Sequence, residues 1–302
     1  MTTDTSDSWY RGRFAPSPTG PLHIGSLYTA VASFIDARAH NGQWLLRIDD
    51  LDPLRCKSEH ASQILKTLEQ YALYWDEDVF YQQTRYPAYQ YALDDLRDQS
   101  LVYPCRCSRK ELEKRHINKG VYDAYCFKHP PSSKQASAVR IKLLSDSISF
   151  NDQVQGRITQ SLKSDVGDFI IYRKDKVASY HLAVALDDAE QRITHIVRGH
   201  DLLDSTARQI YLQQQLHLSQ PNYAHIPVLS DINGDKLSKR TGAEDVALLG
   251  VNHTLIKILG YLNFQPPAEL VTYTGSEILD WAINHWSMAN IKPRATLTIP
   301  NH

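Results

Sequence analysis

The sequence of 302 residues has few cysteines, almost no net charge and no long apolar run. Four cysteines are too few to hold a chain of this size together through disulfides, which excludes a secreted disulfide scaffold. No apolar stretch approaches the roughly 20 residues that cross a bilayer, and residues 1–8 lack the apolar core of a signal peptide. These absences predict a cytoplasmic protein that does not enter a membrane.

The charged residues are unevenly distributed along the chain, although the net charge is near zero. The 33 Lys and Arg residues balance the 34 Asp and Glu residues, so the whole chain is not an obvious polyanion binder. Residues 105–142, however, contain ten basic residues and three acidic ones. This segment could follow a phosphate backbone, and a solvated surface explains its charge equally well.

The chain has no internal repeat or low-complexity tract, and strand and helix patterns alternate along its first hundred residues. We expect strands at 10–14 and 44–48, and helices at 22–40, 61–71 and 89–101. This alternation predicts an α/β fold in which crossover helices connect a Rossmann-type parallel sheet.

The alternation stops near residue 104, where the chain becomes basic and cysteine-bearing. Short strands at 138–144 and 148–154 predict an insertion with a small sheet of its own. The alternation then resumes with strands at 169–173, 193–197 and 226–229 and helices at 182–186 and 205–216, before amphipathic helices at 255–262 and 278–286. We therefore expect five parts: a disordered tail (1–9), a catalytic domain in two halves (10–103 and 168–241), an insertion (104–167) and a short helical C-terminal region (242–302).

Residues 13–26 combine a strand end, a turn and a helix start in the sequence RFAPSPTGPLHIGS. A helix N-terminus offers free N–H groups and the positive end of the helix dipole, which suit a triphosphate. Gly25 allows a flat ring to approach the backbone, and His23 and Ser26 can both donate to phosphate oxygens from one helical face. The alternative is an ordinary strand–turn–helix with a tolerated glycine.

A second candidate segment is a cationic, glycine-bearing loop, NGDKLSKR, at residues 233–240. Adenylate formation expels pyrophosphate, and Lys236 and Lys239 could stabilise the charge that gathers on the β- and γ-phosphates. Lysine-rich surface loops are common, so this segment alone favours a structural interpretation.

Taken together and in order, five segments resemble the glutamyl branch of the class I aminoacyl-tRNA synthetases. They are RFAPSPTG (13–20), HIGS (23–26), RIDDLD (47–52), VRG (197–199) and KLSK (236–239). Only residues 240–302 follow the last segment, too few for a separate anticodon-reading domain. That length and a Cys-x-Cys … Tyr-x3-Cys segment resemble the glutamyl-queuosine branch, whose members activate glutamate with ATP without tRNA and then esterify queuosine in the anticodon of tRNA(Asp).

The resemblance implies a role for each matching residue. Glutamate would contact six residues, through its side-chain carboxylate (Arg13, Arg198), its ammonium (Asp49) and the pocket wall (Ala15, Ser17, Tyr180). ATP, with bound Mg2+, would contact His23, Gly25, Ser26 and Lys239. The catalytic groups on the phosphates would be His23, Ser26, Lys236 and Lys239.

Three positions depart from the family pattern. Asp49 replaces a glutamate, and because it is one methylene shorter, a water can intervene between it and the ammonium. Ser26 replaces a histidine, which the glutamyl branch tolerates, and Leu237 replaces a methionine of similar volume. Each site residue also has a structural alternative: Asp49 in an acidic strand-end turn, Tyr180 as a core aromatic, Arg198 at a strand end.

Cys105, Cys107 and Cys126 provide three thiolates, which zinc favours in tetrahedral sites. From chemistry alone, His116 or His129 would be the fourth ligand. The resemblance instead points to Tyr122, whose phenolate requires a pKa strongly lowered by the metal. We expect one structural zinc with Tyr122 as the fourth ligand; unligated thiols are the alternative.

These observations predict a monomeric enzyme that forms glutamyl-adenylate and transfers glutamate to queuosine in tRNA(Asp). The rival hypotheses are a compact synthetase charging the 3′ end of tRNA(Glu), a non-catalytic tRNA-binding paralogue, and a small-molecule ligase that works through an adenylate. The missing anticodon module argues against the first, the intact His23, Lys236 and Lys239 against the second, and the basic insertion against the third.

Overall fold

The structure is a computed structural model that describes residues 9–115, 121–132, 136–237 and 245–299. Most of the expected N-terminal tail, together with His116 and Lys239, lies outside the described residues.

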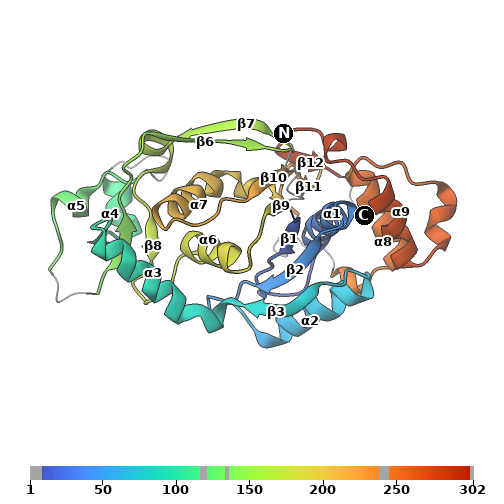
Figure 1. The fold of residues 1–302 in the computed structure, drawn as a ribbon, viewed down its shortest axis with the longest axis horizontal. Helices are drawn as coiled ribbons and strands as arrows, with labels where there is room; N and C mark the ends of the chain where they lie inside the picture. The colour runs from blue at the N-terminus through green and yellow to red at the C-terminus, as the bar shows by residue number, and fades with distance from the viewer. Residues whose placement is uncertain (1–8, 116–120, 133–135, 238–244, 300–302) are drawn as a thin grey trace, which may run out of the picture.

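A parallel sheet lies at the centre of the molecule (Figure 1). In its first half, β1 (Arg11–Phe14), β2 (Gln43–Ile48) and β3 (Asp76–Tyr81) pair in parallel in that order. In its second half, β9 (His195–Gly199) and β10 (Asn222–Ile226) pair in parallel. The expected Rossmann-type alternation is thus confirmed, although β3 was not predicted because its sequence, DEDVFY, is half charged.

The two halves meet between β1 and β9. The N–H of Thr194, the residue before β9, donates to the carbonyl of Arg11 at 2.9 Å, and the Thr194 hydroxyl accepts the Arg11 N–H at 2.8 Å. These bonds place the carboxyl ends of β1, β2, β9 and β10 at one edge, where ligands bind in open α/β sheets.

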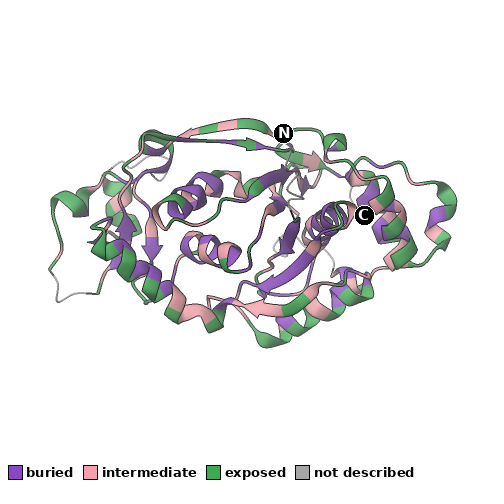
Figure 2. Ribbon diagram, in the orientation of Figure 1, coloured by how far each residue is buried: buried purple, intermediate pink, exposed green. Residues whose placement is uncertain are grey.

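Helices cover the sheet on both faces. They are α1 (Ile24–Ala39), α2 (Ser58–Gln70), α3 (Tyr86–Asp98), α6 (Tyr180–Glu190) and α7 (Leu203–Gln215). β1 and β2 are buried along almost their whole length, whereas the outer faces of α2 and α3 are exposed (Figure 2). α1 is buried on most sides, because it also packs against the C-terminal helices.

The insertion has the expected small sheet, but with different strands. β4 (Val102–Cys105), β5 (Ala138–Ile141) and β8 (Ile170–Tyr172) form it in antiparallel pairs. The strand expected at 169–173 therefore closes the small sheet and does not resume the parallel one. The short helices α4 (Arg109–Lys114) and α5 (Tyr125–Lys128) lie beside it, at one end of the molecule (Figure 1).

The strand expected at 148–154 belongs elsewhere. β6 (Ser147–Asp152) and β7 (Gly156–Ser161) form a hairpin, and β6 pairs with β10, so the hairpin extends the main sheet. The physical reason is Asp152, whose carboxylate accepts the N–H of His225 in β10 at 3.1 Å.

The C-terminal region packs at the other end of the molecule (Figure 1). It contains the two expected helices, α8 (Val251–Tyr261) and α9 (Gly275–Asn284), which pack against each other while α9 also contacts α1. A short strand that was not expected, β12 (Thr296–Thr298), pairs in parallel with β11 (Val228–Ser230). Among the residues described, no helix has both the length and the apolar character needed to span a bilayer.

Candidate active site

A cavity of about 480 Å³ opens at the carboxyl ends of the central strands. Its wall includes all the sequence-predicted glutamate, ATP and catalytic residues that the structure describes: Arg13, Ala15, Ser17, His23, Gly25, Ser26, Asp49, Tyr180, Arg198 and Lys236. The remaining one, Lys239, lies outside the described residues. Segments more than two hundred residues apart in the chain therefore meet around one space.

One end of the cavity is the N-terminus of α1. His23 is the N-cap residue, and its Nε2 lies 3.1 Å from the Ser26 hydroxyl on the next turn. A Cβ added to Gly25 would lie 3.2 Å from the His23 ring, so glycine keeps this surface flat. Lys236 reaches the same space, and its Nζ lies 2.5 Å from a carboxylate oxygen of Asp201. A helix N-terminus with a histidine and a lysine suits phosphate groups.

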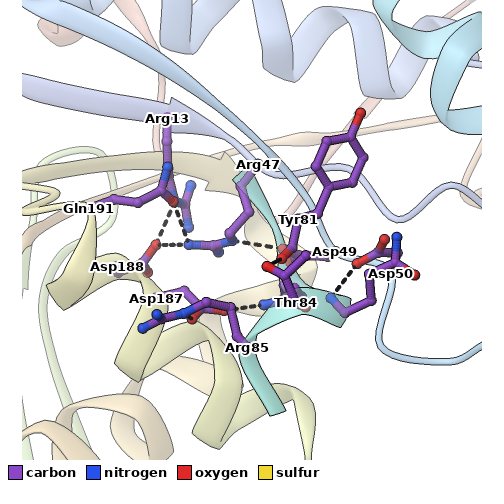
Figure 3. A network of polar contacts seen from close by, with 12 residues as sticks. Arg13, Arg47, Asp49, Asp50, Tyr81, Thr84, Arg85, Asp187, Asp188 and Gln191 are labelled. Atoms are coloured by element: carbon purple, nitrogen blue, oxygen red, sulfur yellow. Dashed lines mark hydrogen bonds and ion pairs between the residues drawn. The ribbon is translucent and has the colours of Figure 1, made fainter. Parts of the chain in front are cut away.

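The other end contains a buried network of arginines and carboxylates (Figure 3). The Asp188 carboxylate in α6 accepts from Arg13 Nε at 3.1 Å and from Arg47 Nη1 at 2.7 Å. Arg47 Nε also donates to Asp49 at 2.7 Å, and the Arg47 side chain is fully buried. Arg47 thus fixes the positions of both carboxylates. Its removal would leave the buried Asp49 without its ion-pair partner and Asp188 with Arg13 alone, at a cost of about 3–5 kcal/mol.

The carboxylates of this network titrate differently. Burial raises the pKa of Asp49 to about 6, although the attraction of Arg47 opposes the rise. For Asp188, burial also acts to raise the pKa, but Arg13 and Arg47 together hold it below its ordinary value. Asp188 is therefore a permanent counter-charge, whereas Asp49 changes its charge close to neutral pH.

Arg198 in β9 is held by hydrogen bonds on two of its three nitrogens. Its Nε donates to His225 Nε2 at 2.9 Å, and its Nη2 donates to the Thr206 hydroxyl at 2.9 Å. Its Nη1 is buried and has no hydrogen-bond partner among the described residues. Because Arg198 lines the cavity, this nitrogen is suited to bind a carboxylate there.

His225 is held in turn by Asp152. His225 Nδ1 lies 2.6 Å from Asp152 Oδ2, and both side chains are fully buried. Since Nε2 accepts from Arg198, the ring proton belongs on Nδ1, where it is donated to Asp152. Burial lowers the pKa of His225 to about 4, so the ring is neutral and remains an acceptor for Arg198 at physiological pH.

Tyr180 lies at the mouth of the cavity. It is the first residue of α6, whose N-cap Ser179 accepts the N–H of Leu182. Its side chain is 37% exposed, which excludes the alternative of a core aromatic. Ala15 and Ser17 reach the same cavity from the turn after β1, and that turn is fixed to β2 where the Asp49 N–H donates to the Pro16 carbonyl at 3.0 Å.

The insertion contains a group of thiols beside the small sheet. The sulfur atoms of Cys105, Cys107 and Cys126 lie within 4.8 Å of one another. The Tyr122 hydroxyl lies 3.5 Å from Cys105 Sγ and 3.3 Å from Cys107 Sγ, and it accepts the N–H of Cys126 at 2.8 Å. Four potential ligand atoms therefore converge on one point.

Arginine side chains contact two of the three sulfurs in this group. Arg140 Nε donates to Cys105 Sγ and Arg115 Nη2 donates to Cys107 Sγ, both at 3.2 Å. Burial acts to raise the pKa of Cys107, but hydrogen bonds from Tyr122 and Arg115 hold it below the ordinary value. Three sulfurs and one oxygen at these separations fit a tetrahedral metal ion with metal–sulfur distances of about 2.3 Å.

The structure describes two of the three candidates for the fourth ligand, Tyr122 and His129. His116 lies outside the described residues, and His129 is exposed, contacts the Tyr125 ring at a tilt of 43° and is not a member of the thiol group. Burial raises the pKa of Tyr122, so its phenol would lose a proton only under the charge of a metal ion.

The basic residues of the insertion lie in two different environments. Two of its arginines, Arg115 and Arg140, contact the thiol group as described above. Among the described residues of 104–132, the exposed cations are Arg106, Arg109, Lys110, Lys114 and Lys128, and two exposed aromatic side chains, Tyr125 and Phe127, lie among them. Cations interleaved with exposed rings are typical of a surface that binds single-stranded nucleic acid.

Sequence reasoning missed several residues that hold the site together: Arg47, Asp152, Asp188, Asp201 and His225. The sequence feature that could have indicated some of these residues is a charged residue within an otherwise apolar helix or strand. Arg47 interrupts the apolar strand β2, and Asp187 and Asp188 follow the apolar run LAVAL in α6. Such residues are almost never buried without a partner, but the partner cannot be named without the fold.

Comparisons with known proteins agree with this site. The family model of the class I tRNA synthetases (E and Q), catalytic domain, matches residues 10–265. A protein of Methylococcus capsulatus named glutamyl-Q tRNA(Asp) synthetase is 49% identical over 94% of this chain and 93% of its own length. Its namesake from Neisseria meningitidis serogroup B is 47% identical over 96% of this chain and 100% of its own.

Solved structures share the fold. A glutamate–tRNA synthetase of Elizabethkingia anophelis has a TM-score of 0.81 and 22% identity, covering 97% of this chain and 68% of its own. A glutamate tRNA ligase of Elizabethkingia meningosepticum, solved in complex with its amino acid, has a TM-score of 0.77 at 22% identity, covering 96% and 67%.

Proposed function

This chain belongs to the class I tRNA synthetases (E and Q), and we propose that it attaches glutamate to queuosine in the anticodon of tRNA(Asp). It first forms glutamyl-adenylate from L-glutamate and ATP without tRNA, and then transfers the glutamyl group to the cyclopentene diol of queuosine. The observation that carries the proposal is the convergence of the ten predicted site residues on one cavity in a chain that matches glutamyl-Q tRNA(Asp) synthetases over nearly their full length.

In the proposed activation step, glutamate and the phosphates of ATP bind at opposite ends of the cavity. Arg198 Nη1 and Arg13 bind the side-chain carboxylate of glutamate, and Asp49 binds its ammonium. ATP binds as its Mg2+ complex with the phosphates at the N-terminus of α1, where His23, Ser26, Lys236 and Lys239 stabilise them. The α-carboxylate of glutamate then attacks the α-phosphorus of ATP, and pyrophosphate leaves. Catalysis rests on positioning and charge stabilisation, without a side-chain nucleophile.

The thiol group holds one structural zinc ion in this proposal, with Cys105, Cys107, Tyr122 and Cys126 as ligands. A bound zinc would crosslink the loop after β4 to α5. It would thereby keep the exposed cations and rings of the insertion in a fixed surface for the anticodon arm of the tRNA.

We propose the same domain boundaries that the sequence predicted. The catalytic domain comprises 10–103 and 168–241, the insertion 104–167 and the C-terminal region 242–302, with the β6–β7 hairpin of the insertion joined to the catalytic sheet. A functional monomer is part of the proposal. The proposed tRNA substrate places the enzyme in the cytoplasm.

ATP–pyrophosphate exchange tests the activation step. We expect exchange that depends on L-glutamate and proceeds without tRNA, with L-glutamine and L-aspartate giving at most a few per cent of the rate. An uncharged amide cannot satisfy Arg198 and Arg13, and aspartate is one methylene too short to reach them. Exchange that required added tRNA would contradict the tRNA-independent step, and absence of exchange under both conditions would contradict an activating enzyme.

A further inference from the structure

A second cavity, of about 420 Å³, adjoins the first. The two cavities share four wall residues: Ser17, Thr19, Asp49 and Tyr180. Three of these belong to the proposed glutamate pocket, whereas His23, Gly25, Ser26 and Lys236 at the phosphate end line only the first cavity. A group in the second cavity would therefore approach the glutamyl part of the adenylate and not the phosphate-binding end of the first cavity.

The second cavity has an apolar side and a cationic side. Leu51, Val177 and Ala178 provide apolar wall area. The cationic side has Arg55 and Arg173, whose side chains are 73% and 41% exposed. An apolar wall beside guanidinium groups suits a nucleoside whose ring packs on the wall and whose flanking phosphates meet the arginines.

Asp52 holds the two guanidinium groups at the cavity. Its Oδ2 accepts from Arg55 Nε at 3.1 Å and from Arg173 Nη1 at 3.4 Å. Arg173 also pairs with the exposed Asp175 at 2.6 Å, which uses its Nη2. The Asp52 bond uses only Nε of Arg55, and among the described residues no acceptor bonds to its two terminal nitrogens. Arg55 is therefore the better placed of the two to bind a phosphate.

The cavity also connects to the basic insertion. Arg173 directly follows β8, the strand that pairs with β5 in the small sheet. An RNA strand that lies on the exposed cations of the insertion would thus be led along this sheet toward Arg173 and the second cavity.

We propose that the second cavity receives the acceptor nucleoside of the RNA during glutamyl transfer, with Arg55 and Arg173 contacting its flanking phosphates. This inference rests on the function proposed above. In the transfer, a hydroxyl oxygen of the nucleoside forms a bond to the glutamyl carbonyl carbon. The bond from that carbon to the AMP phosphate oxygen breaks, AMP leaves with the electron pair, and the hydroxyl proton passes to water.

The test compares the two half-reactions in Arg55→Gln and Arg173→Gln. Glutamate-dependent pyrophosphate exchange without tRNA should stay within about twofold of the wild type, because neither arginine lines the first cavity. Transfer to tRNA(Asp) carrying queuosine should lose about tenfold or more in kcat/KM, the effect of one charge-assisted hydrogen bond. The slope of log kcat/KM against log salt should also fall by about 0.7 for each lost phosphate contact on a single strand.

Arg157→Gln is the matched control. Arg157 is an exposed arginine on β7, outside both cavities, and its replacement should leave exchange, transfer and salt slope unchanged. A third variant, Val177→Phe, narrows the cavity from its apolar side without changing charge. It should reduce transfer and leave both exchange and salt slope intact.

Equal transfer rates and salt slopes in the wild type and all these variants would overturn the assignment of the second cavity. A wild type that exchanges pyrophosphate but does not transfer glutamate to this tRNA would instead contradict the proposed function. The two failures are therefore distinguishable within one set of assays.

Discussion

At the scale of the residue, Arg198 is positioned before any substrate arrives. A chain of buried hydrogen bonds runs from Asp152 through His225 to Arg198, with Thr206 as a second support. The guanidinium loses little freedom when it binds a carboxylate, because its neighbours already fix it. Such prior ordering is how a site gains selectivity from a single charged group.

Arg198→Ala should abolish glutamate-dependent pyrophosphate exchange while ATP still binds, and Arg198→Lys should raise the KM for glutamate about 10- to 100-fold. The lysine keeps the charge but loses the planar fork, and one hydrogen bond to a charged group contributes about 1.5–3 kcal/mol. Exchange kinetics and ATP titration measure both effects. Unchanged exchange in Arg198→Ala would refute the role of Arg198.

His225→Ala should raise the KM for glutamate with less effect on kcat, because Arg198 loses the acceptor that orients it. His225→Gln offers a side-chain oxygen to Arg198 and should recover part of the loss. Steady-state exchange kinetics of both variants measure the split between KM and kcat. If both variants lose only stability, seen by thermal unfolding, and keep the KM of the wild type, His225 is not a positioning residue.

Asp49 should make glutamate use depend on pH. Below a pH of about 6 its carboxyl is protonated and loses the charge that attracts the ammonium, so kcat/KM for glutamate should fall as the pH decreases through that value. The side chain of glutamate itself, with a pKa of about 4.3, stays ionised above pH 5.5. Exchange measured from pH 5.5 to 8 tests this dependence. The Asp49→Asn variant should have a lower and flatter profile; a wild-type profile without a decrease below pH 6 contradicts the assignment.

At the scale of the element, local patterns predicted most of the main helices and strands but not all of their partners. α1, β1 and β2 were predictable because their apolar residues follow the spacing of one element. β6 was expected in the small sheet and pairs with β10 instead, because Asp152 bonds to β10 across a long sequence separation. The three cysteines were predictable from spacing, whereas the contacts of Arg115 and Arg140 with them were not.

The insertion should depend on metal for its local structure. Purified protein should contain about one zinc per chain, and Cys126→Ser should lower that content. The variant should keep tRNA-independent exchange, since no thiol lines the first cavity, but lose transfer to tRNA. Cys56→Ser is the matched control for zinc content alone, because Cys56 lies outside the thiol group but lines the second cavity. Wild-type protein that was purified without chelator and contained no metal would refute the site.

At the scale of the whole molecule, the positions of the catalytic sheet, the insertion and the C-terminal helices fit a chain of this size that modifies a base in the anticodon. The catalytic sheet lies between the basic insertion at one end and the helices α8 and α9 at the other (Figure 1). The predicted α/β fold with an insertion and a helical C-terminal region is confirmed. The buried Arg47–Asp188 pair could not be predicted, because two residues 141 positions apart, one in a strand and one in a helix, form it only in the folded chain.

The central claim is the position at which glutamate is attached. The measurement is transfer of radiolabelled glutamate, with ATP, to tRNA(Asp) with and without queuosine, each with and without its 3′-terminal adenosine, and to intact tRNA(Glu). We predict label only on the queuosine-containing tRNA(Asp), and on its anticodon fragment after nuclease digestion. Label that appears on tRNA(Glu), or that requires the 3′-terminal adenosine, would contradict the account and identify an enzyme that charges the 3′ end.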